Sequence, residues 1–135
     1  MNTYGGVMAR EPIPEDVRRF ILTSIISVPY LEALLLLHHA PDQSWDRTTV
    51  AQRLYISEMA ATELLADLST AGFIVVTDSE SSYRYHPSSD ELRQMIDQLA
   101  ETYAKNLVEV TNIIHSKTAK KAQQFADAFK WRKES

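Results

Sequence analysis

The side chains with the most informative types and spacing lie in two segments of opposite charge. Residues 57–70 read SEMAATELLADLST, with apolar residues at helical spacing, three carboxylates and no Lys, Arg, Asn or Gln. Residues 117–133 read KTAKKAQQFADAFKWRK and combine basic with aromatic side chains. Carboxylates repel phosphates, whereas basic and aromatic side chains suit anionic or protein partners. The chain therefore offers two chemically distinct surfaces to partners.

Catalysis and metal binding are not indicated by the remaining reactive side chains. The chain has no cysteine, which excludes thiolate nucleophiles and Cys-ligated metals. Its four histidines lack a metal-ligand spacing, since the adjacent His38 and His39 would point about 100° apart on a helix. No nucleophile or base is spaced to work with the carboxylates. We therefore predict no enzyme activity, no catalytic residue, no metal and no cofactor.

Length and composition are those of one globular domain. The chain has 135 residues, 44% hydrophobic and 24% charged, with a net charge of −4. Residues 115–135 carry +4, so residues 1–114 carry −8. The apolar run at residues 20–37 contains Pro29, which favours two helices over a membrane span. No export signal is recognisable, so a cytoplasmic protein that avoids membranes is expected.

Periodicity, caps and breakers predict the order of the structural elements. The expected elements are a flexible arm at 1–12, helices at about 14–27, 27–40, 46–54 and 57–71, hairpin strands at 73–77 and 83–85, and a long helix that begins at Ser88 or Ser89 and keeps one apolar stripe to Ile114. Three aromatic residues, Trp45, Tyr55 and Tyr85, are expected to anchor the core. The corresponding domains are 1–12, 13–87 and 88–135.

This order of elements is that of a winged helix-turn-helix. The segment 49–74, TVAQRLYISEMAATELLADLSTAGFI, resembles the helix-turn-helix of bacterial regulators of the MarR and ArsR type. The matching positions are Ala51, Leu54, Ile56, Ser57, Leu65, Leu68, the run 71–74 and the return strand 83–85, within a resemblance that covers about residues 29–87. It implies a mainly α fold with a two-stranded wing, an N-terminal flanking helix and a long C-terminal helix. It also implies a homodimer formed by the flanking helices.

Members of these families dock the second helix of the motif in the DNA major groove. If this chain touches DNA, the candidate contacts are Arg47, Arg53, Ser57, Met59, Thr62 and Arg84. Residues 45–87 hold three arginines against six acids, and base readout ordinarily uses Arg, Lys, Asn or Gln. The sequence therefore predicts a regulator-like protein whose contact with DNA is weak or indirect, unless basic residues from elsewhere cover the acidic helix.

The C-terminal tail supports an alternative function. Its candidate partner-binding residues are Lys120, Lys121, Phe125, Phe129, Lys130, Trp131 and Arg132. In this alternative the chain is an adaptor that does not bind DNA, the winged fold is a scaffold, and the tail recruits a protein or membrane partner. This segment has two other interpretations. It is a plain solvated helix end, or it binds to the acidic helix at residues 57–70.

Overall fold

The central helix α3 (Val28–His39) holds the other elements together. The computed structural model describes residues 12–77 and 81–134, with side chains up to residue 128. Ser27 caps α3 by accepting a hydrogen bond from the Tyr30 amide at 3.2 Å, and Pro29 lies in its first turn. Tyr30 and Leu31 are among its buried residues, and the helix contacts α4, α5, α7 and β3. Its nearly all-round apolar surface therefore predicts its central position correctly.

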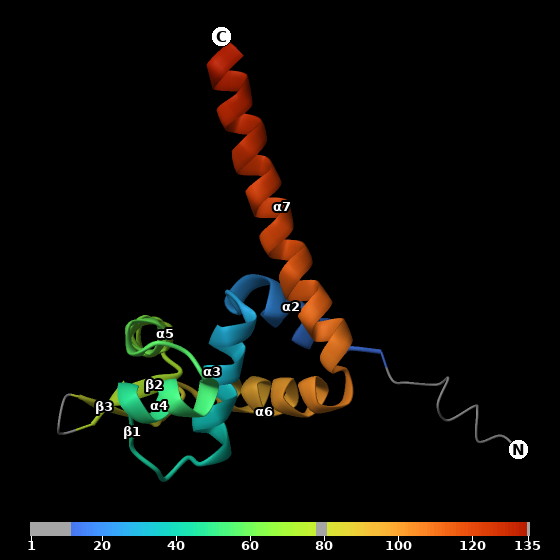
Figure 1. Ribbon diagram of the computed structural model, residues 1–135. Helices are drawn as coiled ribbons and strands as arrows, with labels where there is room; N and C mark the ends of the chain where they lie inside the picture. The colour runs from blue at the N-terminus through green and yellow to red at the C-terminus, as the bar shows by residue number, and fades with distance from the viewer. Residues whose placement is uncertain (1–11, 78–80, 135) are drawn as a thin grey trace, which may run out of the picture.

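Helices α4 (Arg47–Leu54) and α5 (Glu58–Thr70) form the helix-turn-helix (Figure 1). Asp46 caps α4 by accepting from the Thr49 amide at 2.8 Å, and Ser57 caps α5 by accepting from the Ala60 amide at 3.0 Å. Helix α5 ends before Gly72, whose φ of +85° is one that glycine adopts without strain. Both helices begin and end close to their predicted bounds of 46–54 and 57–71.

The turn between α4 and α5 contains a strained residue. Tyr55 ends α4 with φ of 59° and is 94% exposed, so it is not the core anchor that the sequence analysis expects. Its left-handed conformation terminates the helix and points the ring into solvent. An L-residue with a Cβ pays about 1–2 kcal/mol for this conformation.

Replacing Tyr55 by asparagine is expected to raise the free energy of unfolding by about 1 kcal/mol. Asparagine tolerates the left-handed region, and an exposed ring contributes little packing. Denaturant unfolding measures the change. Tyr55→Ala is the matched control, since alanine lacks the short polar side chain that lets asparagine adopt this conformation. If the Tyr55→Asn and Tyr55→Ala variants are equally stable, the left-handed conformation of Tyr55 is not strained.

A three-stranded antiparallel sheet forms the wing and its base. Strands β2 (Ile74–Val76) and β3 (Ser82–Tyr85) are the predicted hairpin, with Ile74 opposite Tyr85. Strand β1 (Trp45–Asp46) pairs with the other edge of β3, which gives the order β1-β3-β2. Strand β1 is not predicted from the sequence, because two residues are too few to show a period. Trp45 and Tyr85 are buried core residues, as predicted.

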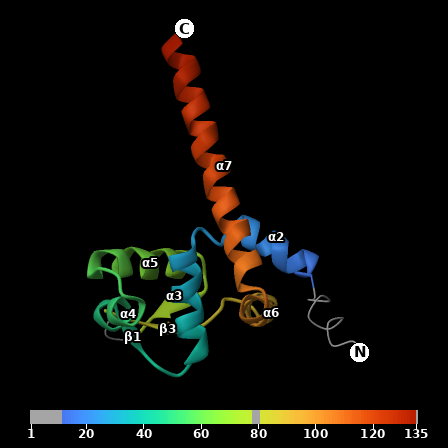
Figure 2. The same ribbon diagram turned by 45° about the vertical axis from the view of Figure 1, so that its right-hand side comes forward.

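The C-terminal region is two helices, α6 (Asp90–Lys105) and α7 (Leu107–Glu134), where the sequence analysis expects one continuous helix to Ile114. The break is at Asn106, which is buried and has φ of −131° and ψ of 48°. Its carbonyl accepts from the Val110 amide at 2.9 Å and so begins α7, which runs in a new direction (Figures 1 and 2). Leu107 consequently leaves the apolar stripe and is 53% exposed.

Helix α2 (Glu15–Ser24) packs against α6 and the first part of α7. Helix α7 then extends well beyond the rest of the fold (Figures 1 and 2). The predicted fold is thus confirmed: a mainly helical winged helix-turn-helix with an N-terminal flanking helix and a long C-terminal helix. Residues 1–11, which include most of the predicted arm, lie outside the described residues.

No single helix in the described part of the chain is long and apolar enough to cross a membrane. Helices α2 and α3 meet the length and composition criteria only as a pair, and they are bent by 113° at their break.

Candidate nucleic-acid interface

The outer face of α5, which consists of Met59, Glu63, Ala66 and Thr70, points to solvent. All four residues are exposed, and Met59 is 75% exposed. The opposite side of the helix is held in the core by Ala61, Leu65 and Leu68. This face is the one that would meet a DNA groove, and its only charge is the carboxylate of Glu63.

The beginning of α5 is tied to the beginning of α4. The Glu58 carboxylate lies 3.5 Å from Arg47 Nε and accepts a hydrogen bond from the Thr48 hydroxyl at 3.2 Å. Arg47 is thereby already balanced by an acid of the same surface. Hydrogen bonds from Thr49 hold the pKa of Asp46 below its usual range, so this neighbouring cap is also a carboxylate. A phosphate here must compete with Glu58 for Arg47.

The two candidate hydroxyls of this region already make local hydrogen bonds. Ser57 accepts from the Ala60 amide, and Thr62 donates to the Glu58 carbonyl at 2.8 Å. A hydroxyl has one donor and two acceptor positions, so Ser57 can still donate to a phosphate while Thr62 is left as an acceptor. Of this pair, only Ser57 suits a phosphate oxygen.

Two of the three candidate arginines lie apart from this group. Arg84 is exposed on β3 opposite Val75, on the outer side of the wing. Arg53 lies over the Trp45 ring, 5.4 Å from its centroid, and lines a cavity with residues of α3 and α6. The structure therefore groups Arg47, Ser57 and Thr62 near the start of α5 and leaves Arg53 on a different side. Asp78 and Glu80 of the wing lie outside the described residues.

The basic segment of α7 does not cover the acidic helix. Lys120 and Lys121 are exposed and line a groove with α2, while α5 lies on the far side of α3 (Figures 1 and 2). Phe125, also on α7, is 75% exposed. The side chains of Phe129, Lys130, Trp131 and Arg132 lie outside the described part of the structure. Among described residues, no cation from α7 offsets the charge of α5.

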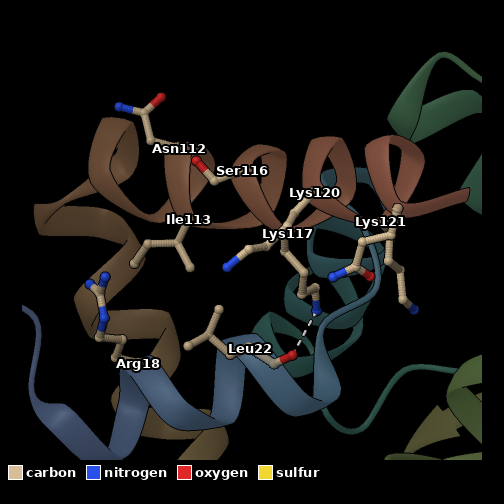
Figure 3. A pocket seen from close by; sticks show the side chains of 9 residues that line it. Arg18, Leu22, Asn112, Ile113, Ser116, Lys117, Lys120 and Lys121 are labelled. Carbon is tan, nitrogen blue, oxygen red and sulfur yellow. Dashed lines mark hydrogen bonds between the residues drawn. The ribbon is translucent and has the colours of Figure 1, made fainter. Parts of the chain in front are cut away.

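One structural role was missed by the sequence analysis. The Lys117 ammonium donates to the carbonyls of Ile21 and Leu22 at 3.1 Å and of Ile25 at 2.5 Å, which ties α7 to the C-terminal end of α2 (Figure 3). A cation is favourable at this end of a helix dipole. Burial, and to a lesser extent the charge of Lys121, lower the pKa of Lys117. No local pattern distinguishes Lys117 from the other lysines of the tail.

Comparison with known proteins gives structural neighbours only. No family model matches the chain, and no curated protein matches it. One similar solved structure is heme-free PefR, with 18% identity and a TM-score of 0.49 over 84% of this chain and 87% of that chain. Another is the heme sensor protein PefR from Streptococcus agalactiae in complex with heme, with 19% identity and a TM-score of 0.47 over 84% of this chain and 82% of that chain.

Proposed function

We propose that this chain is a winged-helix transcription regulator whose contact with DNA is weak or indirect. The observation that carries the proposal is an exposed outer face of α5, in the position of a recognition helix, that holds Glu63 and no cation. The scaffold supports docking on a duplex, whereas the sign of the charge opposes it. On this account Met59 and Thr62 lie nearest the bases, and Arg47, Ser57 and Arg84 lie nearest the phosphates.

A salt titration with a mixed-sequence duplex tests this proposal. With Arg47 and Arg84 as the main phosphate contacts, affinity should fall about tenfold between about 50 and 200 mM salt. Fluorescence anisotropy of a labelled duplex measures both the affinity and the slope. Nanomolar binding that persists at the higher salt concentration would refute weak contact.

We also propose that the chain forms a homodimer through α7. One side of this helix carries a row of residues at helical spacing, here named the α7 outer stripe: Leu107, Val108, Thr111, Thr118, Ala122 and Phe125. Leu107, Val108 and Phe125 are 53%, 61% and 75% exposed. A long helix that leaves its own domain gains stability mainly by burying such a stripe, and a second copy presents the same one.

Replacing Val108 by glutamate is expected to weaken the dimer at least about tenfold, because a carboxylate in a buried interface lacks a partner. Sedimentation velocity over a range of concentrations measures the dissociation constant. Val75→Glu is the matched control, because Val75 is an exposed valine on β2, away from α7. A monomeric wild-type chain, or an equal loss in both variants, would rule out the α7 outer stripe as the interface.

The adaptor function is the second candidate. Its specific support is that Lys120, Lys121 and Phe125 are exposed on α7, far from α5, which suits a partner other than DNA. The same duplex titration separates the two candidates. A complete absence of binding at about 50 mM salt favours the adaptor, since even weak phosphate contacts are measurable there.

A further inference from the structure

A groove between α2 and α7 gathers cations in a protein whose net charge is −4 (Figure 3). Its volume is about 450 Å³, and nine side chains line it. Four of these are basic, namely Arg18, Lys117, Lys120 and Lys121, three are uncharged and polar, and two are apolar. No acidic side chain of the described residues lines the groove. The α2–α7 groove is therefore a local region of positive potential.

Arg18 and Lys120 flank an apolar floor. In Figure 3 they approach from α2 and α7, with Leu22 and Ile113 between them. Leu22 is 44% exposed, so the floor is open to a ligand. Neither Arg18 nor Lys120 forms an ion pair with any carboxylate in the described residues. Both charges are thus available to an anion.

The inner end of the groove is fixed. Lys117 is held there by the three carbonyls at the end of α2, and its charge lies close enough to Lys121 for the two to repel. An anion in the groove relieves this like-charge repulsion. The site is consequently preorganised on one side and open to solvent on the other, where the Lys120 side chain is exposed.

We propose that the α2–α7 groove binds a small phosphate monoester with an apolar body. A phosphate monoester carries about −1.5 to −2 charges and three acceptor oxygens, so it can engage Arg18 and Lys120 together. A carboxylate compensates only one of these cations. The apolar body then contacts Leu22 and Ile113, and the volume lies within the usual range for ligand pockets.

The groove remains accessible in the proposed dimer. At 100° per residue, Ile113 and Lys120 lie on the side of α7 opposite Thr118 and Ala122 of the α7 outer stripe. A second copy on that stripe leaves Ile113 and Lys120 uncovered, whereas Lys121 lies beside the stripe. Lys117 lines the groove and also hydrogen-bonds to the end of α2, which leads into the central helix α3.

Phenyl phosphate, added to the full chain at low ionic strength, is the direct probe. We expect it to shift the methyl resonances of Leu22 and Ile113 in NMR spectra and to bind at least about tenfold more tightly than benzoate, which has the same ring and one charge. The Arg18→Gln and Lys120→Gln variants should each weaken binding at least about fivefold. Lys105→Gln is the control, since Lys105 is an exposed lysine outside the groove and pairs with Glu101.

Three results would overturn the assignment. The first is no shift of either methyl group at millimolar phenyl phosphate. The second is binding that Lys105→Gln weakens as much as Lys120→Gln does, which would indicate a general charge effect. The third is a mixed-sequence duplex that binds in the groove in place of phenyl phosphate and is released by Lys120→Gln, which would assign the groove to nucleic acid. Circular dichroism verifies that each variant keeps the wild-type helical content.

Discussion

Replacing Glu63 and Ala66 by lysine is expected to tighten binding of a mixed-sequence duplex about a hundredfold at about 50 mM salt. The double substitution changes the charge of the outer face of α5 by three units, and each unit contributes roughly 1 kcal/mol for a phosphate at about 4 Å in a water-like dielectric. The slope of affinity against salt should also steepen by about 2, one for each new phosphate contact. Anisotropy titrations at several salt concentrations measure both quantities.

Helix α6 offers a matched control for this experiment. Glu101 and Ala104 have the same residue types and the same spacing of three as Glu63 and Ala66, and all four residues are exposed. Glu101→Lys with Ala104→Lys therefore makes an identical change of net charge on a different face. We expect this control to tighten binding by less than about threefold, because screening limits distant charges. Equal gains in the two double variants would show that net charge, and not the sign of α5, limits DNA binding.

A second large effect is expected at alkaline pH. Burial raises the pKa values of Tyr30 and Tyr85 from 10.0 to about 12, and the nearby carboxylates of Asp67 and Asp97, respectively, add to the shifts. The Tyr85 hydroxyl is also buried without a hydrogen-bond partner among the described residues. The folded state therefore keeps these protons to higher pH than the unfolded state does. Stability is full below pH 10 and is lost as the pH rises toward 12, by up to about 5 kcal/mol for the two groups.

Denaturant unfolding at a series of alkaline pH values measures this loss. Tyr30→Phe should remove about one third of the pH dependence, because phenylalanine cannot ionise and because burial and the hydrogen bond to Glu32 also raise the pKa of Tyr103 to about 12. A flat stability profile up to pH 12 in the wild-type chain would mean that Tyr30 and Tyr85 are not buried as described.

The parts of the fold that the sequence predicts correctly are those encoded within a few residues. Ser57 at the start of α5 and Gly72 after its end are local signals, and both lie where expected. Asn106 shows the limit of such reasoning, because in the sequence the apolar residues continue past it at helical spacing, although the helix ends there. The break depends on how α7 packs against α2 and α3, which is tertiary information. Strand β1 depends in the same way on its partner β3, since Trp45 pairs with Tyr83, 38 residues later in the chain.

In the candidate site, too, the sequence predicts the local features and misses those that depend on tertiary contacts. The periodicity of α5 identifies Met59 and Glu63 as outward and Leu65 as inward, and the structure agrees. The pairing of Arg47 with Glu58 links two helices, so it is visible only once the turn at Tyr55 is formed. The groove between α2 and α7 joins residues about 100 positions apart, such as Arg18 and Lys120, and no local pattern connects them.

Selection from a random-duplex library with the wild-type chain at about 0.15 M salt tests the central claim most directly, because it asks whether α5 reads bases. With Glu63 on its outer face and no cation there, we predict that no sequence motif is enriched above the input library. Recovery of one motif that binds with nanomolar affinity at this salt concentration would contradict the account and establish this chain as an ordinary operator-binding protein.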